Sequence, residues 1–235
     1  MGGQARIVEP EWLDDLPFSD PRAQASRRDL IRLNAVMRQA GLMSRLLKTA
    51  CPKSAPRTIL DLGSGDGLFM LRVARRLSRH WPNLTVVMLD RQARVNRETQ
   101  AQFEKLGWVV EAVSADANAF LQDTRMKSVD IITANLFLHH LAGEKLRHLF
   151  ALTARHTRAF ASCEPRRAPL ALGASRLVGA LGCNAVTRHD AVASVRAGFR
   201  GKELSALWPD ESGWQLVEQS AGLFTHCFAA CHEDS

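Results

Sequence analysis

A glycine-rich loop is the sequence feature that most restricts how this chain can fold. Residues 60–67 read LDLGSGDG and lie where a short apolar run gives way to a segment with helical spacing. Glycines at such a junction let the backbone approach a ligand closely, and the first N–H groups of the helix are free to bind it. A tight turn without a ligand would not need three glycines in five positions. The loop therefore predicts a ligand-binding junction between a strand and a helix.

From residue 57 to residue 164 the chain alternates between apolar strands and amphipathic helices. Continuous apolar strands separated by helices are typical of a parallel sheet covered on both faces. The spacing predicts strands at 58–62, 84–90, 108–113, 129–135 and 158–164, and helices at 67–80, 92–106, 117–123 and 143–154.

Both ends of the chain depart from this alternation. Residues 1–21 are polar and predict a poorly ordered or surface-draped arm, and 22–49 have helical spacing with a break at Gly41. Residues 165–212 are mostly helical, and the last two apolar runs predict a hairpin with its turn at 220–222. We therefore expect an α/β fold with seven strands, mostly parallel, and a C-terminal antiparallel hairpin.

The charges in the loop indicate which ligand it binds. A dinucleotide-binding loop has the pattern G-x-G-x-x-G, whereas here the third glycine comes one residue early. The loop also carries Asp61 and Asp66, which would repel a pyrophosphate and attract an ammonium and a sulfonium. Spacing and charge both favour S-adenosylmethionine (SAM) as the cofactor.

The loop resembles the first motif of the class I SAM-dependent methyltransferases, and the resemblance extends over residues 57–164. It implies a Rossmann-like sheet and an enzyme that transfers a methyl group. It also implies that acids and amides at successive strand ends bind the cofactor: Asp90 the ribose, with Arg91 next to the adenine, Asp116 the adenine, and Asn135 the methionine part. The implied cofactor-binding residues are Asp61, Gly63, Ser64, Gly65, Gly67, Asp90, Arg91, Asp116, Ala117 and Asn135.

The fourth strand is followed by Leu-His-His-Leu at 138–141. This motif resembles small-molecule methyltransferases related to the quinone-biosynthesis enzymes, and the segment 188–209 resembles, more loosely, bacterial methyltransferases that tailor type III polyketide phenolic lipids. Together these likenesses imply a small aromatic acceptor, methylated at a phenolic hydroxyl, in secondary metabolism. We expect the chain to consist of an arm and helical lid (1–56) and a methyltransferase domain (57–235), in which residues 165–212 cover the acceptor.

A phenol has to lose its proton during methyl transfer, so a histidine base would help. The candidates are His139, His140 and His189, although at least one of the first two can equally pack against or cap the following helix. Arg188, His189 and Arg196 are candidate acceptor-binding residues, and the two arginines can instead be ordinary surface charges.

The positive charge is concentrated near the N-terminus. The formal net charge is +7, and residues 22–57 contain nine Lys or Arg and one acid. An anionic membrane surface or an acidic partner would therefore meet this segment first. Nucleic acid is a less suitable partner, because the segment has no aromatic residue on which bases could stack. An RNA methyltransferase and a non-catalytic SAM-binding protein remain the alternatives.

Cysteine and histidine usage points away from a metal centre. The five cysteines form no C-x-x-C pair, which favours free thiols and a cytoplasmic location. Cys227 and Cys231 fall on one face of the last strand, and His226 and His232 on the other. Four ligands cannot converge from opposite faces, so we predict no zinc site there.

Overall fold

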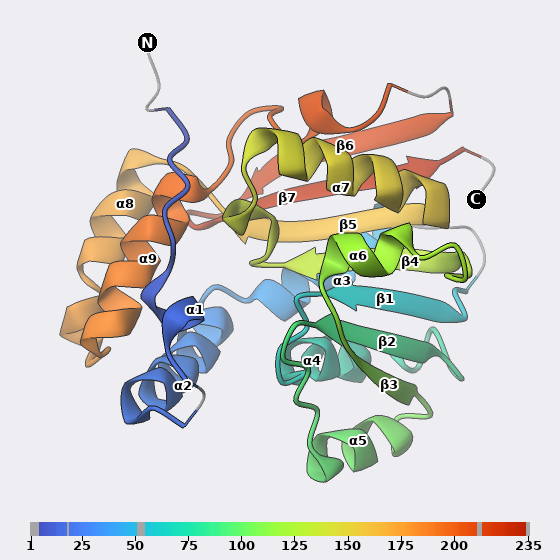
Figure 1. Ribbon diagram of the computed structural model, residues 1–235, viewed down its shortest axis with the longest axis horizontal. Helices are drawn as coiled ribbons and strands as arrows, with labels where there is room; N and C mark the ends of the chain where they lie inside the picture. The colour runs from blue at the N-terminus through green and yellow to red at the C-terminus, as the bar shows by residue number, and fades with distance from the viewer. Residues whose placement is uncertain (1–4, 18, 51–54, 211–212, 234–235) are drawn as a thin grey trace.

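The computed structural model describes residues 5–17, 19–50, 55–210 and 213–233. Its centre is a seven-stranded sheet with the strand order β3-β2-β1-β4-β5-β7-β6 (Figure 1). The strands are β1 (Thr58–Leu62), β2 (Thr85–Asp90), β3 (Val109–Ser114), β4 (Val129–Asn135), β5 (Thr157–Pro165), β6 (Trp214–Ala221) and β7 (Thr225–His232).

The pairing of the strands confirms the predicted fold class. The neighbours from β3 through β5 pair in parallel, whereas β7 pairs antiparallel with both β5 and β6. The parallel strands therefore end at one edge of the sheet, where open α/β sheets bind their ligands.

Two helical layers cover the sheet. One face carries α3 (Gln39–Ala50), α4 (Leu68–Leu77) and α5 (Arg97–Glu104), and its core includes Met43, Leu47 and Phe103. The other carries α6 (Ala117–Gln122) and α7 (Gly143–His156), and its core includes Phe150 and Phe160. Each strand thus buries side chains on both faces, which explains the continuous apolar runs in the sequence.

A third group of helices lies beyond the carboxyl edge of the parallel strands (Figure 1). It consists of α1 (Trp12–Asp15), α2 (Pro21–Val36), α8 (Pro169–Arg176) and α9 (Ala185–Ala197), with short 3₁₀ turns at η1 (Leu138–His140) and η2 (Val178–Leu181), whereas η3 (Ser205–Leu207) packs against α7 and β6. The helical character predicted for 165–212 is present as α8, η2, α9 and η3. Among the residues described, no helix is long and apolar enough to cross a membrane.

The N-terminal helices differ from the prediction in two ways. The break lies at Arg38, which has a positive φ of 55°, and Gly41 lies inside α3. The predicted lid over 22–50 is also only partly present. The α2 helix packs on α9 at the carboxyl edge, whereas α3 buries Leu46 against the sheet because its apolar positions form a full stripe.

Candidate active site

The glycine loop leaves β1 and leads into α4, as predicted. Gly63 has a φ of 70°, and a Cβ atom there would lie 2.6 Å from Cδ2 of Phe137, so the loop packs closely against the end of β4. Gly65 has a φ of 57°, and a Cβ atom there would meet nothing within 4 Å. One glycine thus permits tight packing, and the other leaves an open approach for a ligand.

Asp61 is a buried carboxyl group at this loop. It is 2% exposed and accepts one hydrogen bond of 2.7 Å from Oγ1 of Thr133. Burial raises its pKa to about 7; the Thr133 bond opposes this shift, and the nearby Asp90 carboxylate adds to it. A cation placed beside Asp61 would remove this penalty, because it would stabilise the ionised form.

Two more of the predicted acids lie at the ends of β2 and β3. Asp90 accepts hydrogen bonds from the backbone N–H groups of Gly65 (3.0 Å) and Gln92 (2.7 Å), so it joins the loop to its own strand end. Asp116 caps α6 by accepting from Asn118 and Ala119 through Oδ1. Arg91 is exposed next to Asp90.

Two buried polar atoms near the loop have no hydrogen-bond partner among the described residues: Oγ of Ser64 and Oδ1 of Asn135. Buried polar atoms are normally satisfied, so both suit a polar ligand. With Asp61 and Asp90 they form a set of acceptors at adjacent strand ends. The residues present therefore fit a cofactor with ammonium and hydroxyl groups.

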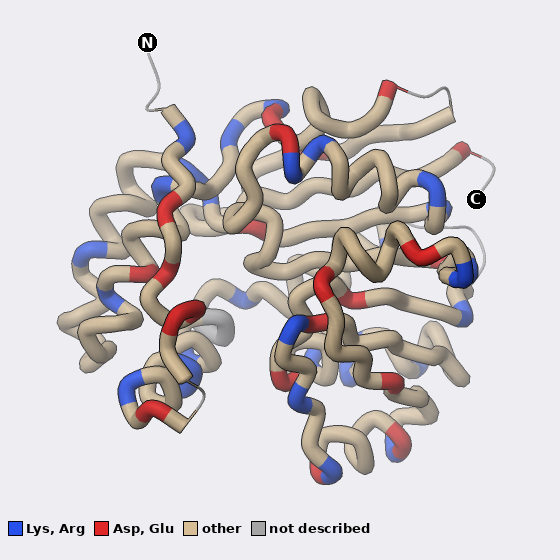
Figure 2. The backbone as a smooth tube through the Cα atoms, in the orientation of Figure 1, with Lys and Arg blue, Asp and Glu red and all other residues tan. Residues whose placement is uncertain are grey.

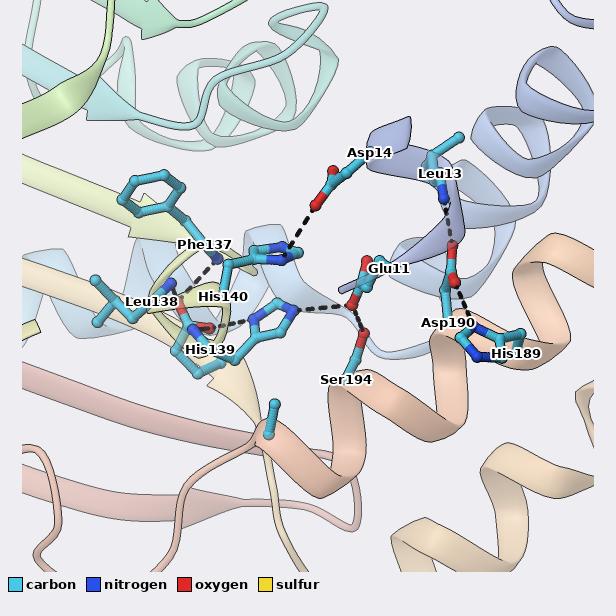
Figure 3. A network of polar contacts seen from close by, with 12 residues as sticks. Glu11, Leu13, Asp14, Phe137, Leu138, His139, His140, His189, Asp190 and Ser194 are labelled. Atoms are coloured by element: carbon cyan, nitrogen blue, oxygen red, sulfur yellow. Dashed lines mark hydrogen bonds and ion pairs between the residues drawn. The ribbon is translucent and has the colours of Figure 1, made fainter. Parts of the chain in front are cut away.

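The two adjacent histidines follow β4 and lie within η1 (Figure 3). His139 is 3% exposed and lies between two carboxylates: Nδ1 is 2.8 Å from Oε2 of Glu164, and Nε2 is 3.3 Å from Oε1 of Glu11. Glu164 is fully buried at the end of β5 and also accepts from the backbone N–H groups of Phe137 and Leu138. It therefore holds both the turn and the imidazole in place.

The pKa values of the two histidines are shifted in opposite directions. Burial lowers the pKa of His139, but the hydrogen bonds to Glu11 and Glu164 outweigh burial and raise the pKa to about 9. Burial and the positive charge of His139 lower the pKa of His140. His140 is also less enclosed, with 30% of its side chain exposed, and its Nδ1 lies 3.6 Å from Oδ2 of Asp14. At neutral pH, His139 is thus an imidazolium and His140 is neutral.

An N-terminal arm, residues 5–15, closes this site from outside (Figure 3). Arg6 donates to the carbonyl groups of Ala197 and His139, and its guanidinium lies 4.4 Å from the ring centre of Phe199. Acidic residues gather along the arm (Figure 2), and Glu11 reaches both His139 and Oγ of Ser194. The predicted arm thus runs over the surface, and its acids complete a charged network.

His189 lies on the far side of the arm from His140 (Figure 3). Its Nδ1 is 2.9 Å from Oδ1 of Asp190, and its ring stacks on Trp12 at 4.0 Å. Asp190 also accepts from the backbone N–H groups of Trp12 and Leu13, so this pair secures α1. The structure does not bring His189 together with the other two histidines.

The two arginines predicted to bind the acceptor make other contacts. Arg196 lies 3.9 Å from Glu9 of the arm, measured between Nη1 and Oε2. Arg188 is exposed, and a Cβ atom at Gly179 would lie 2.8 Å from its Cδ. Arg196 therefore faces the arm, and Arg188 faces η2.

One group within the described parts of the chain could hold a metal ion: Glu11, His139 and His140 offer ligand atoms within 4.8 Å of one another. The two imidazole rings, however, stack at 4.1 Å with a tilt of 34°, and the proton on His139 already supplies positive charge between the carboxylates. In the hairpin, His226 bonds to Glu218, and Sγ of Cys227 lies 3.7 Å from Sγ of Cys163.

The acids that organise this site are not among the residues predicted from the sequence: Glu11, Asp14, Glu164 and Asp190. A signal for Glu164 exists, since it is an acid at the end of an apolar strand next to Pro165. The arm acids have no such signal, because their partners lie more than 120 residues away in the sequence.

Comparisons with known proteins agree with this geometry. Residues 59–159 match a family model described as "Methyltransferase domain". An 87-residue stretch is 31% identical to an indolepyruvate C-methyltransferase from Streptomyces griseus, and the match spans 37% of this chain and a quarter (25%) of that protein.

Solved structures show the same fold. The plantazolicin methyltransferase BpumL, solved with SAH, has a TM-score of 0.62 at 14% identity, and the likeness covers 92% of both chains. An O-methyltransferase family protein from Burkholderia thailandensis has a TM-score of 0.58 at 18% identity, covering 92% of this chain and 61% of that one. Residues 59–159 are thus similar to a methyltransferase domain, and the chain has the fold of solved SAM-dependent methyltransferases, with the predicted cofactor loop after β1.

Proposed function

We propose that this protein transfers the methyl group of SAM to a hydroxyl group of a small aromatic acceptor. The observation that carries the proposal is the neutral, partly exposed His140, which stands at the end of β4 next to the strand whose loop fits the cofactor. A proton acceptor and a methyl donor would then meet at one edge of the sheet.

The residues at the strand ends would hold the cofactor. Asp61 suits a cationic group, and Asp90 suits a diol because a carboxylate can accept two hydrogen bonds. Ser64 and Asn135 would satisfy their buried atoms on the ligand. SAM, when bound, supplies an electrophilic methyl carbon on a sulfonium.

His140 would act on the acceptor. Its neutral imidazole would take the hydroxyl proton of the acceptor, while bound SAM would supply the methyl group and be released as S-adenosylhomocysteine. The arm and the helices of 165–212 would cover the acceptor and exclude water. His139 stays protonated in this scheme and positions its neighbour, so we do not assign it as the base.

Methylation at carbon is the second candidate, because the relative with 31% identity is a C-methyltransferase. An activated ring carbon or an enol also loses a proton, and His140 would serve it equally. The kinds of acceptor distinguish the two reactions: a phenol whose ortho and para carbons are all substituted can only be methylated at oxygen.

The experiment is incubation with methyl-labelled SAM and a panel of phenols, quinones, 2-oxo acids and RNA. We expect label in a phenol, and Asp61→Asn should abolish it. Label in RNA, or no label although SAM binds, would replace the proposal by one of the two alternatives considered above, an RNA methyltransferase or a non-catalytic SAM-binding protein. Asp210→Asn, a substitution at an exposed acid outside the loop, is the matched control.

A further inference from the structure

The basic character of the N-terminal segment has a definite place in the fold. A hollow of about 310 Å³ opens between the start of α3 and the exposed side of α4. We call it the arginine hollow, and its lining consists of Arg38, Ala40, Gly41, Phe69, Arg72, Arg75 and Arg76. Four guanidinium groups from two separate stretches of sequence, one before α3 and one on α4, thus meet around one concavity.

No negative charge compensates these four arginines. The described lining contains no acid, and among the described residues none of the four forms an ion pair. Holding like charges together costs free energy unless an anion joins them. The arrangement therefore favours a negatively charged ligand.

Two of the arginines are held in fixed positions. Arg72 donates to the backbone carbonyl of Ile31 on α2 (3.5 Å), and Arg75 donates to the side chain of Gln102 on α5. These contacts use only part of each guanidinium, which has five N–H donors. The remaining donors are positioned for a group with several acceptor oxygens, and the guanidinium fork matches phosphate best.

The size and lining of the hollow limit which negatively charged ligand it can bind. Its volume is at the small end of the range for small-molecule sites and is too limited for a nucleic-acid strand. Phe69 adds an aromatic wall on which a planar ring could stack. A membrane is a poor fit, because none of the large, well-exposed apolar side chains described lies on α3 or α4.

We propose that the arginine hollow binds a small phosphate-bearing molecule with an attached planar ring, of the kind that a nucleoside diphosphate represents. The site is distinct from the cofactor loop, since no residue of the loop lines it. The bound group would lie on the outer side of α4, the helix that the loop begins. Binding there does not require methyl transfer.

The test is calorimetric titration of ADP into the protein with S-adenosylhomocysteine present, so that the cofactor site is blocked. The variant is Arg75→Gln with Arg76→Gln. The control is Arg45→Gln with Arg79→Gln, which removes the same charge from exposed positions on or just beyond the same helices. We expect ADP binding to weaken at least tenfold in the first and less than twofold in the second, with equal melting temperatures.

Three results would overturn the proposal. The first is the absence of ADP binding to the unaltered protein. The second is an equal loss in both variants, which would reduce the site to diffuse surface charge. The third is binding to phosphatidylglycerol vesicles, but not to ADP, that disappears in the Arg75/Arg76 variant; this would assign the hollow to a membrane.

Discussion

His139 and His140 are neighbours in sequence and yet have different chemical roles. Two carboxylates hold a proton on His139, and that charge in turn helps to keep His140 neutral. A pair that sequence alone treats as equivalent is therefore divided by its surroundings into a charged and a neutral imidazole, which suit the positioning residue and the base of the proposed function.

The neutral state of His140 leads to predictions for the turnover of a variant and for the dependence of the rate on pH. His140→Ala should lower turnover by about 100- to 10,000-fold, the usual contribution of a general base, while SAM binding survives. In the unaltered enzyme, the rate should fall on acidification below the ordinary histidine pKa of 6.5, since the pKa of His140 is lowered. Steady-state kinetics from pH 5 to 9 would measure both. His189→Ala serves as the control, and equal losses in the two variants would contradict the assignment.

His139 should also make stability depend on pH. Its folded pKa of about 9 lies above the unfolded value, so its contribution is complete below about pH 6.5 and is lost as the pH rises through 9. His139→Gln should therefore reduce the free energy of unfolding by about 3 kcal/mol at pH 6 and by much less at pH 9.5. Urea unfolding measures this. His80→Gln, at an exposed histidine, is the control.

Asp61 should also make the ligand-free fold less stable as the pH rises, but over a lower pH range, and here removing the ionisable group should stabilise the protein. Its raised pKa means that ionisation destabilises the ligand-free fold as the pH rises from about 4 through 7. Asp61→Asn should keep the bond from Thr133 and should stabilise the ligand-free protein at pH 8 by up to about 4 kcal/mol, with little effect at pH 4. Urea unfolding at the two pH values is the measurement, and a less stable variant at pH 8 would show that Asp61 carries no such penalty.

Among the elements, the arm depends on α9. Asp190 accepts from the first two N–H groups of α1, which have no partners within that helix. Asp190→Asn removes the charge and one acceptor, so hydrogen exchange over residues 6–15 should accelerate by about tenfold or more, while exchange in the strands stays unchanged. Asp20→Asn, at an acid that pairs only with Arg22 nearby, should leave the arm protected.

The regular elements could be predicted from the sequence because their signals are local. The glycine loop, the apolar strands and the C-terminal hairpin each follow from spacing over a few residues, and the structure has all three, although the hairpin turn lies at 222–224 rather than at 220–222 because β6 runs on to Ala221. The break at Arg38 could not be predicted, because a left-handed arginine depends on packing between helices rather than on local preference.

For the molecule as a whole, the sequence predicted which strand ends would carry polar groups but not what would cover them. Asp61, Asp90 and Asn135 lie at neighbouring ends because parallel strands share an edge. The arm reaches this edge of the sheet through contacts such as Glu11 with His139, two residues that only the folded chain brings together.

Cofactor binding should stabilise the whole molecule. At about a hundred times its dissociation constant, SAM should add about 2.7 kcal/mol to the free energy of unfolding, which corresponds to about 5 to 10 °C in melting temperature. NAD at the same concentration should give no shift. Thermal melting with each ligand is the measurement, and a shift with NAD alone would contradict the assignment of the loop.

The position of the arm has a consequence for how the protein is made. Residues 5–15 are synthesised more than 120 residues before their partners on η1, β5 and α9. The arm therefore stays without these partners until the chain as far as α9 has been made, and contacts this far apart in sequence form slowly. The charged network around His139 thus cannot form until both segments have been synthesised.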